Sequence, residues 1–189
     1  AGTNLQIRAS KTEPVELFTT DLDQNGTLDP ILTHYINGQS YPIASRDELL
    51  EQVVPMRKKF VYYKDYADVK LDGIVPASQK KKLHRLEVNN FASGILWNEG
   101  SQPWKFAALP DLAQISSLQA AIVLDWNKDC RPDIYLGGNF EGYRVQFGQS
   151  DASYGLLLEN SGNQQFKSIS PMETGVFLKG ELRQMKLLN

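Results

Sequence analysis

Two acidic loops constrain this chain more than any other feature of its sequence. The first runs from Asp21 to Asp29 and the second from Asp125 to Asp133. Each loop places oxygen-bearing side chains at positions 1, 3, 5 and 9. This alternation lets a tight turn aim several hard oxygen ligands at one point, which is the coordination that Ca²⁺ requires. We therefore predict two calcium sites, one in each loop.

The two predicted sites use ligands of the same kind, namely side-chain oxygens at positions 1, 3, 5 and 9 and the backbone carbonyl at position 7. A carboxylate at position 9 can bind through both of its oxygens, so each loop offers about six donor atoms to an ion that takes six to eight. The ligands expected in the first site are Asp21, Asp23, Asn25, Thr27 (through its carbonyl) and Asp29. Those expected in the second are Asp125, Asn127, Asp129, Arg131 (through its carbonyl) and Asp133. Cys130 replaces glycine at position 6 of the second loop, which predicts a weaker site there because cysteine does not relax into a tight turn as glycine does.

The residues around both loops indicate strands. Apolar runs precede the loops at residues 15–20 and 120–124 and follow them at residues 30–36 and 134–136. An EF-hand would instead need flanking helices and a glutamate at position 12, where this chain has Leu32 and Leu136. A solvated turn rich in Asp and Asn is the alternative for either loop. The repetition of one ligand pattern in one strand context favours the metal sites.

A second repeated pattern follows each loop at a distance. Residues 94–104 and 156–166 both contain an apolar run, then Asn-x-Gly, then an aromatic residue, a pattern typical of a hairpin turn. The C-terminal stretch 182–189 matches residues 118–125, so Asn189 stands where the first ligand of a further loop would begin. Repeats of this length predict short-stranded units that stack as propeller blades.

The two loops lie farther apart than one repeat, and the extra residues have helical character. Ser45 with Glu48 forms a capping-box pattern, and Pro55 stands at the start of a second helical run. We predict a largely helical insertion at residues 37–82 that packs its apolar residues onto the strands. The residues expected in that packing are Leu49, Leu50, Val53, Phe60 and Tyr63.

Composition and charge exclude several classes of protein. The apolar and charged contents, 41% and 22%, are those of an ordinary soluble domain, and the net charge of −2 gives no basic footprint for nucleic acid. No apolar run approaches the roughly 18 residues of a membrane span, and no signal peptide is present, so an export signal is expected to lie outside this sequence. The lone Cys130 forms no intramolecular disulfide. It has no nearby histidine either, since His34 and His84 fall in distant strand-like runs.

The stretch 125–139, with its Asp-x-Asn-x-Asp-x-x-Pro-Asp-Ile-Tyr-Leu-Gly-Gly-Asn pattern, resembles the FG-GAP or VCBS repeat of integrin α-subunit propellers. Residues 29–32, 40–50, 137–140 and 150–155 are similar to secreted Bacteroidetes VCBS-repeat proteins related to cartilage acidic protein, which often carry an ASPIC/UnbV region. The resemblance implies a mainly β fold in which residues 1–189 form part of a β-propeller of four-stranded blades. It also implies a secreted or cell-surface location in a Gram-negative bacterium and a place within a larger protein.

Two functions compete on this reading of the sequence. The first is a non-enzymatic, calcium-stabilised scaffold of integrin-like repeats for adhesion or another interaction. Its protein or glycan ligand stays open, and self-association through open blade edges is a further expectation. The alternative is a carbohydrate-active lyase or hydrolase that uses paired carboxylates on a propeller face. Its candidate acids are Asp65, Asp68, Asp72, Glu141 and Asp151. Aromatic residues that would stack on sugars, or more simply pack between strands, are Tyr41, Trp97, Trp104, Tyr143 and Tyr154. We recognise no catalytic constellation, which favours the scaffold.

Overall fold

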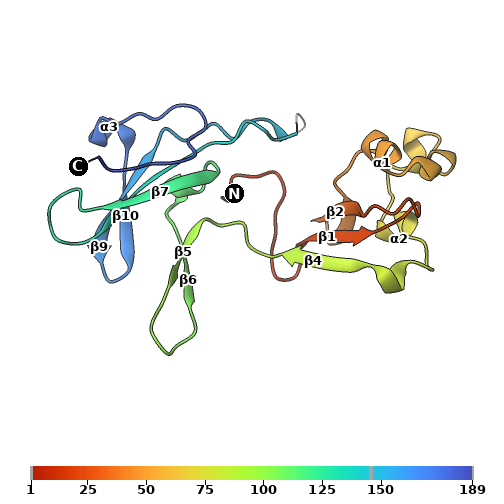
Figure 1. Cartoon of the computed structure of the whole chain (residues 1–189), viewed down its shortest axis with the longest axis horizontal. Coiled ribbons are helices and arrows are strands. Elements are labelled where there is room, and N and C mark those ends of the chain that lie inside the picture. Colours follow the sequence, from red (N-terminus) through yellow and green to blue (C-terminus); the bar gives the residue numbers. More distant parts are fainter. Residues whose placement is uncertain (1, 145–146, 189) are drawn as a thin grey trace. The chain divides into compact units, whose positions relative to one another are not determined.

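The computed structural model describes residues 2–144 and 147–188, and its contacts divide them into two compact units. The N-terminal unit comprises Ile7–Asn90, and the C-terminal unit comprises Phe91–Asn189 together with the first six residues. Each unit contains one acidic loop and one four-stranded antiparallel sheet (Figure 1). A third, two-stranded sheet belongs to the C-terminal unit. The predicted mainly β class is therefore confirmed.

The N-terminal unit is built on a sheet of strand order β3-β2-β1-β4, which we call the first sheet. The first acidic loop joins β1 to β2, as the apolar runs on either side of it predicted. The strands are β1 (Val15–Thr20), β2 (Asp29–Ile36), β3 (Gln39–Pro42) and β4 (His84–Val88). The helices between β3 and β4 are α1 (Arg46–Gln52), η1 (Val54–Lys58), η2 (Tyr63–Asp65), α2 (Leu71–Ile74) and η3 (Lys80–Lys82).

The helices cover one face of the first sheet. Ser45 caps α1 through the predicted capping box with Glu48. Behind it Leu49 and Phe60 are buried in one cluster with Phe18 of β1. The other members of the cluster are Leu22, Ile31, Leu50, Val53, Ile74 and Val75. Leu49, Leu50, Val53 and Phe60 thus pack as expected.

Two details of the helical segment differ from the prediction. Residues 39–42 form β3 and pair with β2, so the helical residues begin only at Arg46. Tyr63 is exposed because its hydroxyl donates to Asp47 (2.6 Å) and its ring lies beneath the guanidinium of Arg46. Polar contacts at the surface therefore hold Tyr63 away from the core.

The C-terminal unit is built on a sheet of strand order β10-β9-β8-β7, which we call the second sheet. The second acidic loop joins β7 to β8, and the strands follow one another as a meander. Its strands are β7 (Leu118–Leu124), β8 (Asp133–Gly138), β9 (Leu156–Gly162) and β10 (Gln165–Ile169). The remaining elements are the hairpin of β5 (Gly94–Trp97) and β6 (Lys105–Ala108), the short helix η4 (Asp111–Ala113) and α3 (Pro171–Thr174).

The second sheet is covered on both faces. On one face Leu136 and Leu158 form a buried cluster with Leu109 and Ala113, and Ile95 of the β5–β6 hairpin packs against it. On the other face the segment after α3 crosses the sheet: the hydroxyl of Tyr135 donates to the carbonyl of Val176 (3.3 Å), and the Leu182 amide donates to the carbonyl of Gly138 (2.9 Å). A side chain at Gly137 would overlap Leu182.

The C-terminal stretch does not form the strand that its match to β7 predicted. Residues 181–188 have no regular secondary structure. The Leu182 amide bonds to Gly138 of β8, but no strand of the described chain forms a ladder with these residues, and a strand needs a neighbour to satisfy its backbone groups. Asn189, the predicted start of a further loop, lies outside the described residues. Among the described helices, none is both long and apolar enough to cross a membrane.

Candidate metal centre

The two acidic loops close equivalent hairpins. Position 9 of each loop is already the first residue of the returning strand, and it pairs with the residue just before position 1: Asp29 with Thr20, and Asp133 with Leu124. The sequence between these pairs must therefore make the same reversal in both units.

Five hydrogen bonds from backbone amides shape each loop, and they join the same positions in both. The carboxylate at position 1 accepts from the amides of positions 5 and 6, and the side chains at positions 3 and 5 accept from the amide two residues later. The carboxylate at position 9 accepts from the amide of position 2. In the first loop these distances are 3.0, 2.9, 3.2, 2.8 and 2.8 Å. In the second they are 3.0, 3.0, 3.1, 2.9 and 2.8 Å.

The backbone of the two loops also turns in the same places. Positions 4 and 6 both have positive φ: 60° and 88° at Gln24 and Gly26, and 61° and 63° at Lys128 and Cys130. Cys130 thus adopts the left-handed conformation that glycine takes in the first loop. Because a Cβ makes that conformation unfavourable, the replacement costs stability without changing the shape of the turn.

In the first loop the carboxylates converge. Ligand oxygens of Asp21, Asp23 and Asp29 lie within 4.8 Å of one another. Two oxygens bound to one Ca²⁺ at 2.3–2.6 Å are at most about 5 Å apart, so this spacing fits a single ion. The donor set consists of oxygens alone, which suits Ca²⁺ better than a metal that prefers nitrogen or sulfur. The hydroxyl of Thr27 donates to the side-chain oxygen of Asn25 and so helps to fix the position of that oxygen within the loop.

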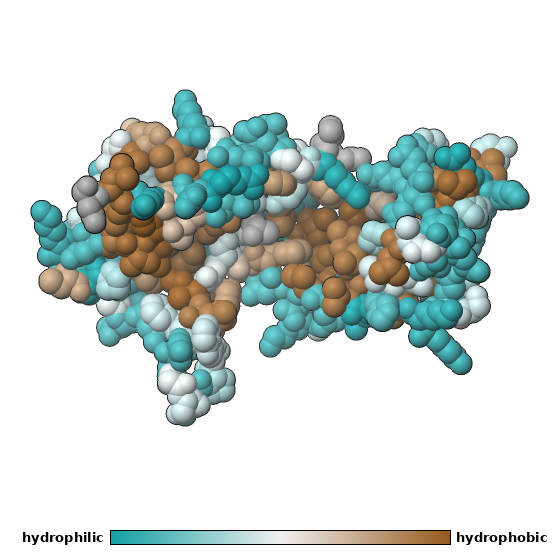
Figure 2. All heavy atoms as spheres, in the orientation of Figure 1, coloured by the Kyte–Doolittle hydropathy of each residue, from teal (hydrophilic) through white to brown (hydrophobic). Residues whose placement is uncertain are grey.

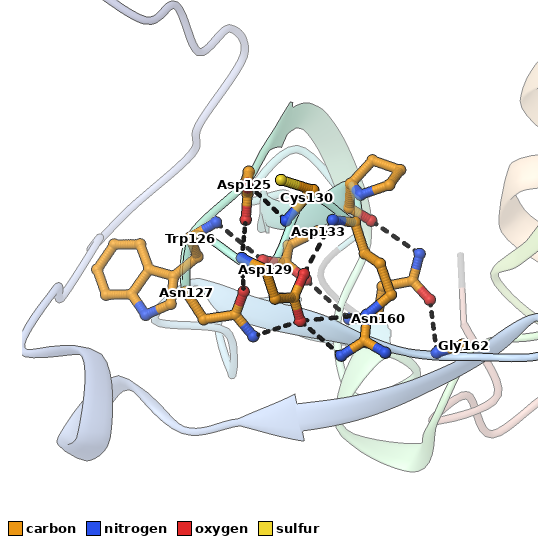
Figure 3. A network of polar contacts seen from close by, with 10 residues as sticks. Asp125, Trp126, Asn127, Asp129, Cys130, Asp133, Asn160 and Gly162 are labelled. Carbon is orange, nitrogen blue, oxygen red and sulfur yellow. Dashed lines mark hydrogen bonds and ion pairs between the residues drawn. The ribbon is translucent and has the colours of Figure 1, made fainter.

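In the second loop the side chain of Arg131 forms an ion pair with one of the expected ligands, the carboxylate of Asp129. Asp129 accepts from the guanidinium of Arg131 at 2.6 and 3.1 Å and from the side-chain nitrogen (Nδ2) of Asn127 at 2.8 Å (Figure 3). These bonds hold the pKa of Asp129 below its ordinary value, the hydrogen bond from Arg131 contributing most. Among the described residues, only the acids of the first loop gather as a group of three. The first loop contains no Lys or Arg, whereas the second contains Lys128 and Arg131.

Residues outside the loops hold them in place, and the sequence patterns did not reveal this role. Leu22 at position 2 of the first loop is buried in the core of its unit, and its carbonyl accepts from Gln79 (3.2 Å). In the second loop the fully buried Asp133 also accepts from the amide of Asn160 (2.8 Å), whose side chain donates to the carbonyl of Pro132 (3.1 Å).

Asn160 had a visible signal in the sequence. It belongs to the repeated Asn-x-Gly pattern, and Gly162 donates to its side chain at 2.9 Å, just as Gly100 donates to Asn98 at 3.0 Å. The pattern identified both turns. It did not indicate that one of them abuts an acidic loop.

Two of the carboxylates proposed for glycan cleavage have local partners. Asp65 accepts from the amide of Tyr62 (2.9 Å) at the start of η2, and Asp72 is paired with Lys80 (2.7 Å). Two of the proposed aromatic residues pack as well: Trp97 stacks on Phe166 with ring centroids 6.2 Å apart, and Tyr143 lies edge-on to Phe140. Trp104 and Tyr154 are exposed. These contacts favour a structural role for Asp65, Asp72, Trp97 and Tyr143.

Comparison of the chain with protein-family models gave no match, and comparisons with curated proteins and with solved structures gave none either. The likeness to FG-GAP and VCBS repeats therefore depends on the residues quoted for it and stays a prediction.

Proposed function

We propose that this chain is a calcium-binding, non-enzymatic interaction module, with its four-stranded sheets acting as blades of an FG-GAP-like propeller outside the cell. The observation that carries the proposal is the clustering of Asp21, Asp23 and Asp29 in a loop whose shape recurs in the second unit. One such loop is a common surface turn. The two loops share the same five hydrogen bonds from backbone amides, and each closes a hairpin of a four-stranded sheet. This repetition points to a shared task.

The metal's task in this proposal is structural. An ion in the first loop would neutralise three acids that lie close together, and it would tie the end of β1 to the start of β2. Extracellular calcium modules bind with Kd of about 10⁻⁴–10⁻³ M, and we expect an affinity in that range for the first loop. The ligand recognised by the module is left open.

Thermal unfolding in Ca²⁺ tests the proposal. At 10 mM Ca²⁺ and a Kd near 1 mM, binding to the folded state adds about 1.4 kcal/mol to the free energy of unfolding. For one site, that is equivalent to a rise of about 3–6 °C in Tm for a chain of this size. Mg²⁺ should give a smaller rise because it demands a tighter, octahedral set of ligands.

Two variants make the test specific. Asp21→Ala removes an acceptor for two loop amides and a predicted ligand, so it should abolish the share of the Tm shift that comes from the first loop. Asp68→Ala changes an exposed acid of the same unit outside the loop and should keep that share. No Tm shift and no heat of binding in the unaltered, chelator-treated chain would refute the proposal.

A further inference from the structure

The segment that follows α3 crosses the second sheet, and its residues 176–182, which we call the strap, are held through the main chain. Four strap residues, each two positions from the next, make one such hydrogen bond to the body of the C-terminal unit. The bonds join Tyr135 Oη to Val176 O (3.3 Å), Leu178 N to Tyr154 O (2.9 Å), Asn139 Nδ2 to Gly180 O (3.1 Å) and Leu182 N to Gly138 O (2.9 Å). Because every peptide carries main-chain donors and acceptors, these bonds do not require the strap's own side chains.

The sheet presents an apolar surface to the strap. Tyr135 and Leu157 stand opposite each other on β8 and β9, and they alternate along these strands with residues of the buried cluster on the other face. Both are buried, although neither belongs to that cluster. Gly137 lies on the same side of β8 as Tyr135, and a Cβ there would overlap the Cδ2 atom of Leu182. The missing side chain of Gly137 therefore makes room for the leucine of the strap.

The strap itself is only partly buried. Residues 176–182, whose structure is described throughout, include no buried residue and no member of the buried cluster of their unit. Phe177 is 53% exposed, and Figure 2 shows hydrophobic atoms at the surface beside α3 and the C-terminal end. Gly180 has a φ of 75°, a conformation that favours glycine and bends the strap. The strap thus packs on the sheet as a bound peptide does, and the core of the unit does not contain its side chains.

We propose that the surface beneath the strap is a peptide-binding site, which the strap occupies here as an intramolecular ligand. Main-chain hydrogen bonds give such a site affinity, and room for particular side chains gives it specificity. The peptide that fits has a leucine to place over Gly137 and a glycine two residues before it, as the strap has Leu182 and Gly180. A tethered strap competes at high effective concentration, so an external peptide binds in the fraction of molecules whose strap is released. The site would give the proposed interaction module a partner, yet it does not rest on calcium binding.

Fluorescence anisotropy of a labelled peptide with the sequence of residues 175–188, added to the full chain in chelator, tests the proposal. Leu182→Asp in the chain places a charge against the apolar sheet and weakens the chain's own strap. This variant should therefore bind the leucine-containing probe at least about tenfold more tightly than the unaltered chain does. Phe177→Asp is the matched control, because it introduces the same charge at an exposed position of the strap and should leave the probe's affinity unchanged. A probe with aspartate in place of its leucine should not bind.

An exchange of volume between site and probe shows where the probe binds. Gly137→Ala, added to the Leu182→Asp chain, fills the space of the leucine Cδ2 atom and should weaken binding of the leucine probe. A probe with alanine in place of that leucine should bind the doubly altered chain more tightly than the leucine probe does, because the Cβ of residue 182 lies 3.6 Å from the added Cβ, an ordinary contact.

Circular dichroism checks that the variants fold, and the Leu182→Asp comparison decides the matter by itself if Gly137→Ala does not. The proposal is overturned if the leucine probe does not bind the Leu182→Asp chain or binds the unaltered chain equally well. It is also overturned if a folded, doubly altered chain still prefers the leucine probe. Because every titration is done in chelator, the Tm shift with Ca²⁺ stands or falls separately.

Discussion

An exchange of the residues at loop position 7 should exchange the calcium affinities of the two loops. The guanidinium of Arg131 lies 2.6 Å from the Asp129 carboxylate that would also bind the ion in the second loop. A Ca²⁺ at about 2.4 Å from the same oxygen would be at most about 5 Å from that nitrogen. The first loop has Thr27 at this position and no cation. Arg131→Thr should therefore tighten the second loop, and Thr27→Arg should weaken the first.

The size of the effect follows from the two ways in which Arg131 can accommodate an ion. If the side chain stays, the repulsion between one and two positive charges at about 5 Å in water corresponds to roughly a tenfold loss of affinity. If it turns away, the chain loses a surface ion pair, which corresponds to a factor of at most about five. The expected change in Kd is thus about two- to tenfold in each loop, in opposite directions.

Calorimetric titration with Ca²⁺ measures both changes when one loop is silenced at a time. Asp21→Ala silences the first loop and Asp125→Ala the second. Arg183→Thr is the matched control, because it removes an exposed arginine that is ion-paired with Glu181 outside both loops and should alter neither Kd. The exchange effect should shrink at high salt, where exposed charges are screened. Unchanged affinities, or a tighter first loop in Thr27→Arg, would show that the side chain at position 7 does not govern these sites.

Three further changes test other parts of the fold. Cys130→Gly should raise stability by about 1 kcal/mol in chelator, because it removes left-handed strain from the turn, and by more in Ca²⁺, because the relaxed turn should bind the ion more tightly; chemical denaturation measures both gains, and a variant no more stable than the unaltered chain would contradict this reason. Leu49→Ala should cost the N-terminal unit about 2–5 kcal/mol, since its side chain is fully buried, and a loss below about 1 kcal/mol would argue against that packing. Burial, aided by the charge of Glu48, raises the pKa of Tyr66 to about 12. The folded state therefore keeps its proton while the unfolded state loses it near pH 10, so the stability from Tyr66 is complete below pH 10 and is lost between pH 10 and 12. Between pH 10 and 12, Tm should fall less steeply with pH in Tyr66→Phe than in the unaltered chain. Equal slopes would refute the raised pKa of Tyr66.

The parts of this fold that are local in sequence were predictable. The runs around each acidic loop form strands because they alternate or are continuously apolar, and Ser45 with Glu48 starts a helix by satisfying backbone amides at the helix end. β3 escaped prediction because Gln39–Pro42 has neither an apolar alternation nor a β-branched residue. Its place in the sheet comes from pairing with β2 across a tight turn.

The parts that depend on distant partners were not predictable from spacing. β4 joins β1 only after the chain has passed through all the helices of its unit, so its register reflects tertiary contacts. In the candidate site, the sequence located both loops between strands and predicted a weaker second site because of Cys130. It did not predict the ion pair of Arg131 with Asp129, which depends on the direction of the Arg131 side chain. Tyr63 was expected in the core on hydrophobicity alone, yet its hydroxyl and ring both found polar partners at the surface.

The hydrogen bonds from backbone amides inside the two loops have a consequence for the rate of ion exchange. Because the peptide groups of the first loop already orient Asp21 and Asp29, a cation entering that loop would meet donors in place and would order little additional chain. Exchange of the ion should then be limited by the release of its own hydration water. Such a loop could load and empty many times while its hairpin stays closed, and its occupancy could follow a changing supply of ions without a refolding step.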